Sequence, residues 1–163
     1  MVHSELYSTV LSTFQTEGWE YTEVSGREVL RSGFEAHHTR VELHVQTFEP
    51  LSAHQTSNPA KRERLAELAM RVNQTLTIGN FELNWDAGQL IFRATNLFPT
   101  PQGDQSIIKG LVHNAIGEMD RIAPLENMVL TAEGATLAGI NLVQQLQRID
   151  LLPEVSTPDS TDH

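Results

Sequence analysis

The stretch that decides the fold is residues 58–98, which read NPAKRERLAELAMRVNQTLTIGNFELNWDAGQLIFRATNLF. Asn58 and Pro59 are typical of a helix start, because the asparagine side chain accepts from an unpaired amide and proline has no amide to satisfy. Apolar residues then recur at helical spacing, at Leu65, Leu68, Ala69, Val72 and Leu76. This stripe predicts an amphipathic helix with one buried face.

The residues that follow this helix alternate between apolar and polar, which predicts a β-hairpin. The first arm carries Phe81, Leu83 and Trp85 on one face, and the second carries Leu90, Phe92 and Ala94. Residues 86–88, Asp-Ala-Gly, lie between the arms and supply the turn. The hairpin offers the apolar face against which the helix packs.

Size and composition favour one soluble domain. The chain has 163 residues, 39% of them hydrophobic, which is enough for a single core. We expect this domain to span residues 1–152 and residues 153–163 to form a disordered tail. No window resembles a membrane span or a secretory signal, so we expect a cytoplasmic protein. The absence of cysteine excludes disulfides, thiolate metal sites and cysteine nucleophiles.

The charge balance argues against nucleic-acid binding. Eleven Lys and Arg residues against 21 Asp and Glu residues give a formal charge of -10, which repels a phosphate backbone. The one basic cluster, residues 61–64, is diluted by Glu63. We expect it to be a solvated helix face, with a ligand-binding patch as the alternative.

The rest of the chain predicts an α+β fold. A helix is expected from the cap Ser4 to the stop Gly18, and the residues between this helix and the long helix are expected to form three strands. The run from Pro50 to Asn58 is expected to be an edge strand or a loop. After the hairpin, a helix capped by Asp104 is expected to break at Pro124, followed by a short helix over 125–132 and a last helix over 135–147. The predicted order is α-β-β-β-α-β-β-α(α), with an antiparallel sheet and helices packed on one of its faces.

The sequence assigns no catalytic, cofactor-binding or metal-binding residue. The seven histidines lack ligand spacing, since His37 and His38 are neighbours on an expected turn and His44 points outward from a strand. The glycines are scattered, so no phosphate-binding loop is indicated, and no serine lies in a nucleophile elbow. We therefore predict no cofactor and favour a binding role over catalysis.

Two features are candidates for binding. Three acidic residues, Glu17, Glu20 and Glu23, surround Trp19 and Tyr21, which predicts either an acidic and aromatic surface or ordinary solvation around two core rings. The second feature is the charge-free run 135–147, whose apolar residues spread over more than one helix face. Its candidate interface residues are Leu137, Ile140, Leu142, Val143 and Leu146. Packing on two sides within the monomer is the alternative to an interface.

Several local motifs together resemble the YbjN family. They are Gly18-Trp19, the helix end Arg71-Val72-Asn73, residues 78–83 (IGNFEL), the turn at 86–88 and residues 91–94 (IFRA). The family is assigned to bacterial sensory transduction regulators without an established reaction, and its fold is similar to class I type III secretion chaperones. The resemblance implies structural roles for Asn73, Gly79 and Phe81. Chaperones of that fold are small acidic dimers that hold a partially unfolded client segment on apolar grooves, so the resemblance also implies a dimer with such a client.

The resulting hypothesis is a protein-binding module of chaperone-like or regulatory type. The alternative is a small-molecule-binding sensor or an enzyme of unrecognised type, with a pocket between the concave sheet face and the loop from Pro99 to Gly103. We also predict a homodimer in which residues 125–149 supply much of the contact, because charged residues are depleted at interface cores.

Overall fold

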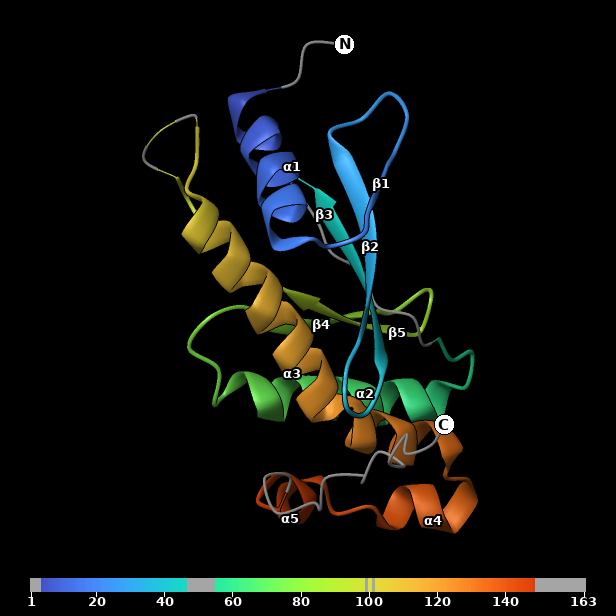
Figure 1. Cartoon of the computed structure of the whole chain (residues 1–163). Helices are drawn as coiled ribbons and strands as arrows, with labels where there is room; N and C mark the ends of the chain where they lie inside the picture. The colour runs from blue at the N-terminus through green and yellow to red at the C-terminus, as the bar shows by residue number, and fades with distance from the viewer. Residues whose placement is uncertain (1–3, 47–54, 99, 101, 149–163) are drawn as a thin grey trace, which may run out of the picture.

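The structure is a computed structural model that describes residues 4–46, 55–98, 100 and 102–148. Residues 50–54 of the expected edge strand or loop, and the expected tail, lie outside these residues. The elements in chain order are α1 (Glu5–Glu17), β1 (Thr22–Glu23), β2 (Val29–Glu35), β3 (Arg40–Gln46), α2 (Pro59–Asn73), β4 (Asn80–Asn84), β5 (Gln89–Arg93), α3 (Gln105–Thr131), α4 (Gly134–Gly139) and α5 (Leu142–Leu146). The α+β class and the predicted element order are confirmed (Figure 1). No helix in the described part of the chain is long and apolar enough to cross a bilayer.

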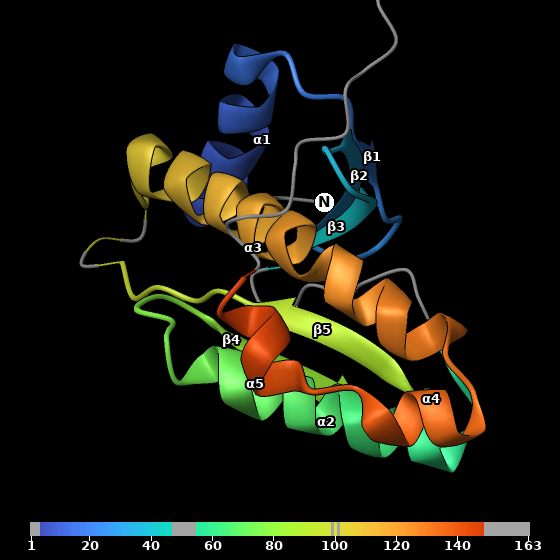
Figure 2. The ribbon, with the colours of Figure 1, turned by 90° about the horizontal axis from the view of Figure 1, so that it is seen from below.

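The strands form two antiparallel sheets. One sheet has the order β1-β2-β3 and the other is the β4-β5 hairpin. The hairpin lies between α2 and α3 (Figure 2), and residues 89–92 of β5 are all buried. Helices cover both faces of this hairpin, so successive side chains of β5 are buried on both sides. In a sheet with one face in water, buried and exposed side chains would alternate.

Helix α1 begins and ends where its sequence predicts. The Ser4 hydroxyl accepts from the amide of Tyr7, and Gly18 ends the helix with a φ of 70°. Helix α2 starts at the predicted cap, since the Asn58 side chain accepts from the amide of Ala60 at 3.0 Å. These local signals are reliable because the capping contacts join residues only a few positions apart.

Asn73 joins the end of α2 to the outer edge of β4. Its side chain accepts from the Phe81 amide at 2.7 Å and donates to the Phe81 carbonyl at 2.9 Å. The Asn73 side chain thus satisfies both backbone groups of Phe81, as the backbone of a neighbouring strand would. Asn73 therefore has a structural role, because it holds the end of α2 against β4.

The C-terminal helices differ from the prediction in two places. Helix α3 runs through Pro124 for 27 residues, so the expected break is wrong. Proline costs the helix one hydrogen bond, but Ala123 and Leu125 on either side are buried and hold this turn against the core. The expected single helix over 135–147 is also wrong, because the Asn141 side chain accepts from the Gln144 amide at 3.1 Å and starts α5 as a separate helix.

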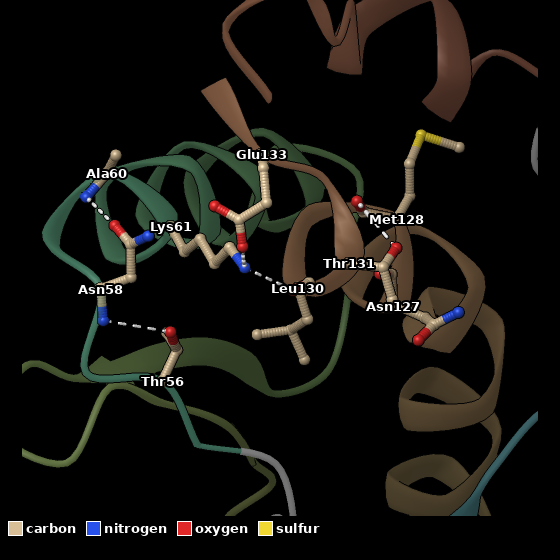
Figure 3. A network of polar contacts seen from close by, with 9 residues as sticks. All are labelled: Thr56, Asn58, Ala60, Lys61, Asn127, Met128, Leu130, Thr131 and Glu133. Atoms are coloured by element: carbon tan, nitrogen blue, oxygen red, sulfur yellow. Dashed lines mark hydrogen bonds and ion pairs between the residues drawn. The ribbon is translucent and has the colours of Figure 1, made fainter. Parts of the chain in front are cut away.

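The basic cluster on α2 was expected to be a solvated, salt-bridged helix face, and for Lys61 the expected exposure to solvent is wrong. The Lys61 side chain is buried, and its ammonium donates to the Leu130 carbonyl at 2.7 Å and pairs with Glu133 (Figure 3). Arg64 donates to the Ile140 carbonyl, between α4 and α5. The long aliphatic stems of these residues cross apolar surface to reach polar groups. The cluster therefore fastens the C-terminal segment to α2.

Candidate functional site

The three-stranded sheet has one buried face and one polar face. Along β2, Leu30, Ser32 and Phe34 turn toward the core, while Arg31 and Glu35 are exposed on the opposite face. The register pairs Arg31 with His44, Gly33 with Glu42 and Glu35 with Arg40. All these pairs lie on the polar face, because facing residues of an antiparallel pair share a face.

The strand β1 is too short to cover the edge of β2. It pairs only Thr22 with Arg31 and Glu23 with Leu30. Beyond Arg31, β2 has β3 on one side and no strand on the other among the residues that the structure describes. The edge of β2 from Ser32 to Glu35 is therefore open on the β1 side.

The hydrogen-bond alternation fixes which backbone groups point to this open edge. The Ala36 amide donates to the Thr39 carbonyl at 2.9 Å, so the backbone groups of Ala36 point toward β3. The Val29 carbonyl accepts from the Val24 amide at 2.9 Å, so the backbone groups of Val29 point toward β1. Backbone direction alternates along an antiparallel strand. The amides and carbonyls of Gly33 and Glu35 therefore point outward, and no described residue bonds to them on that side.

A shallow depression of about 640 Å³ lies along this edge. It is lined by Trp19, Glu20, Tyr21, Thr22, Arg31, Ser32, Gly33 and Glu42. The Ser32 hydroxyl donates to the Glu20 carbonyl at 2.7 Å and holds the segment before β1 beside the strand. An exposed strand edge in a depression with both apolar and polar walls is suited to an extended peptide.

Aromatic rings form one wall of the depression. The Trp19 ring packs edge-on against Phe14 at 5.1 Å, Phe34 at 5.5 Å and the His113 ring at 5.5 Å between centroids. Tyr21 packs against Phe14 at 5.8 Å. Both rings are half-buried, so each contributes to the core and also presents one side to the depression. Both alternatives predicted for these rings therefore apply, because each ring packs against the core and also lines the surface depression.

Of the two arginines on the polar face beside the edge, Arg40 forms ion pairs within the described part of the chain and Arg31 does not. Arg40 binds Glu35 at 2.7 Å and Glu42 at 3.0 Å, and its guanidinium lies over Gly33. Arg31 has no ion pair among the described residues. Burial, and then the charge of Arg31, lower the pKa of His44, while Glu42 opposes them. The polar face therefore keeps the guanidinium of Arg31 available for a partner.

The acidic group predicted from sequence is dispersed by the fold. Glu17 pairs with Lys109 at 2.6 Å, and Glu23 accepts from the Tyr7 hydroxyl at 3.4 Å. Burial, and then the charge of Glu23, raise the pKa of Tyr7 to about 12. Only Glu20 of the three acidic residues lines the depression. The acidic residues therefore do not act as one patch.

The five candidate interface residues lie in different environments. Leu137 and Leu142 are buried in the core of the chain, at 4% and 1% exposure, and Ile140 and Leu146 pack against that core. Val143 is 43% exposed. Of the five, Val143 is the residue that a second chain can reach most directly.

Sequence reasoning missed the open edge of β2. Its one signal is Gly33, because a glycine inside a strand pattern often marks a place where another backbone approaches closely. The pocket expected at the loop from Pro99 to Gly103 lies partly outside the described residues, which exclude Pro99 and Pro101. Within the described ranges, no three histidine or carboxylate side chains are grouped as a metal site would need.

Comparison of the chain with protein-family models, with curated proteins and with solved structures found no match.

Proposed function

We propose that this protein is a protein-binding module that pairs an extended segment of its partner with the open edge of β2. The observation that carries the proposal is the open edge of β2, where the backbone groups of Gly33 and Glu35 point outward. Gly33 also lines the depression beside Trp19 and Tyr21. An added strand would satisfy these backbone groups, and the alternate side chains of the segment would give specificity. One set of side chains would meet the aromatic wall, and the other would meet Arg31 and Glu42.

The fold supports this proposal by its element order. The order agrees with the one that the resemblance to the YbjN family implies, and that family is similar in fold to chaperones that hold a partially unfolded client segment. Gly79 has a φ of 77° and Phe81 is buried, as structural roles at these positions require. On this proposal the protein acts in the bacterial cytoplasm as a chaperone-like or regulatory homodimer.

Amide exchange tests the state of the edge before any partner is known. We expect the amides of Gly33 and Glu35 to exchange rapidly in the free protein, because they face solvent. The amides of Ser32 and Phe34 face β3, so they should exchange slowly. Equal, strong protection of all four amides would contradict the open edge.

The binding test uses peptides selected from a displayed random library against the whole chain. A selected peptide should protect the Gly33 and Glu35 amides. Gly33→Pro removes the outward amide, and proline is tolerated where a strand amide faces solvent. We expect it to weaken binding about fivefold, which corresponds to about 1 kcal/mol for one hydrogen bond.

Gly33→Ala is the matched control. It also adds a carbon that approaches the flexible end of Arg40 at 3.0 Å, but it keeps the amide. Binding that is weakened equally by both variants would show a steric effect and contradict strand pairing. Failure to select any peptide, or peptides that leave both amides unprotected, would overturn the proposed function.

A further inference from the structure

A second depression lies between α3 and the segment that joins α2 to β4. It has a volume of about 280 Å³ and is lined by Thr75, Leu76, Thr77, Ile78, Asn114, Glu118 and Arg121. None of these residues lines the depression at the edge of β2. The two sites are therefore separate, and ligand binding at the second does not depend on the proposed function of the first.

The α3 wall is a row of three polar side chains. Asn114, Glu118 and Arg121 are spaced at i, i+4 and i+7, so they lie on one face of the helix. Asn114 donates to the Ile78 carbonyl at 3.4 Å and ties the connecting segment to α3. This long hydrogen bond joins the two walls of the depression.

Glu118 and Arg121 form an ion pair with unused hydrogen-bonding capacity. Arg121 donates from Nε at 2.9 Å and from Nη2 at 2.7 Å to the same carboxylate oxygen of Glu118, Oε2. A guanidinium has five N–H donors and a carboxylate has two oxygens. Three donors of Arg121 and the second oxygen of Glu118 therefore remain available within the described structure.

The charges in this depression select against ions. The lining holds one cation and one anion that neutralise each other. An anionic ligand would bring its charge close to Glu118, and a cationic ligand would bring its charge close to Arg121, and both pairs of like charges repel. A neutral ligand that both donates and accepts hydrogen bonds meets neither penalty.

The connecting segment adds a hydroxyl and an apolar surface. The Thr77 hydroxyl makes no hydrogen bond within the described residues. Ile78 is 54% exposed although it is aliphatic. A ligand with hydroxyls on its edge and C–H groups on its face would use both kinds of group.

We propose that this depression binds a neutral ligand with adjacent hydroxyl groups, of the size of a monosaccharide. One hydroxyl of a vicinal diol donates to the free oxygen of Glu118 and its neighbour accepts from Arg121, so two adjacent hydroxyls match the pair. The sugar ring then covers Ile78.

The test is a titration of the ¹⁵N-labelled full chain, followed by NMR, with a panel of aldohexoses. Glycerol, glycine and inorganic phosphate are titrated in parallel. We expect at least one hexose to shift the amides of Thr77 and Ile78 and the side-chain amide of Asn114, with a Kd near ~1 mM. Glycerol should bind more weakly, because it lacks the ring, and glycine and phosphate should leave these signals unchanged.

Variants separate this site from a general surface effect. Glu118→Gln keeps the shape but removes the charged acceptor, and we expect it to weaken hexose binding about tenfold. Glu67→Gln is the matched control, because Glu67 pairs with Arg64 and Arg71 on α2 and does not line this depression. The control should bind the hexose as the unaltered chain does.

Three results would overturn the proposal. One is the absence of shifts at these signals with every hexose at ~10 mM, ten times the expected Kd. Another is saturable binding of phosphate or glycine in place of the hexoses. The third is equal binding by Glu118→Gln and Glu67→Gln. Circular dichroism of each variant checks that the fold is retained.

Discussion

At the scale of single residues, Lys61 shows how one buried cation secures the end of α3. Its ammonium reaches the Leu130 carbonyl, in the last turn of α3, and the Glu133 carboxylate just beyond (Figure 3). Carbonyls at a helix C-terminus lack intrahelical partners and carry partial negative charge, so a cation there satisfies and stabilises them. Lys61 is 8% exposed, so water cannot easily replace it.

We expect Lys61→Met to lower the free energy of unfolding by about 1–3 kcal/mol. Methionine keeps most of the buried stem but leaves the part-buried Leu130 carbonyl without its donor. Urea denaturation followed by circular dichroism measures the change.

Glu133→Gln is the control for this prediction. The Glu133 side chain is 70% exposed, so its ion pair with Lys61 is screened and its loss should change the free energy of unfolding by less than ~0.5 kcal/mol. Equal effects of the two substitutions would show that the ion pair, and not the hydrogen bond to the carbonyl, holds the helix end.

At the scale of elements, Gly88 joins the β4-β5 hairpin to the segment that precedes α2. It has a φ of 62°, and an added Cβ would lie 1.7 Å from the Thr56 carbonyl oxygen. The Thr56 amide donates to the Gly88 carbonyl at 2.9 Å, and Gln55 forms a bridge with Gln89 next to it. The close backbone approach therefore requires glycine here.

We expect Gly88→Ala to destabilise the fold by at least ~3 kcal/mol, because left-handed strain adds to a clash with fixed backbone. Gly26 provides the comparison, since it has a φ of 78° but an added Cβ would meet nothing within 4 Å. Gly26→Ala should cost about 1–2 kcal/mol, which is the conformational term alone. Thermal unfolding of both variants measures the two losses, and similar losses would disprove the close approach at Gly88.

The elements that could be predicted from sequence are those with local signals. The cap at Asn58 and the turn at 86–88 depend on contacts between near neighbours, and both are found where the sequence places them. The continuity of α3 through Pro124 depends on distant packing, which a local rule about proline does not contain. The β2 edge was missed for the same kind of reason, because it depends on how few residues of β1 pair with β2.

At the scale of the whole molecule, α3 connects the two sheets. It contacts β3 of the three-stranded sheet, β5 of the hairpin, and both α1 and α2. The His38 amide donates to Asp120 of α3 at 2.5 Å, so the β2-β3 turn is also fastened to this helix. One long helix therefore fixes the positions of the elements around both candidate sites, and the short helices α4 and α5 lie at the opposite end from the start of α1 (Figure 1).

The fastening of α4 and α5 changes how the predicted homodimer must be tested. Their apolar residues gave the reason for expecting a dimer, but Leu142 is buried inside the chain itself. Leu142→Asp should therefore unfold the C-terminal segment, at a cost of several kcal/mol, whether or not a dimer exists. A substitution at Leu142 cannot report on association.

Val143 can report on association, because it is 43% exposed and lies next to Leu142 on α5. If the homodimer forms through these helices, the unaltered chain should scatter light as a particle of twice the 18.2 kDa of one chain. Val143→Asp should then give a monomer with an unchanged circular dichroism spectrum, since a charge at the centre of an interface is costly while a charge on a free surface is not. An unaltered chain that is monomeric at micromolar concentration would disprove the homodimer. A dimer that survives Val143→Asp would move the interface away from α5.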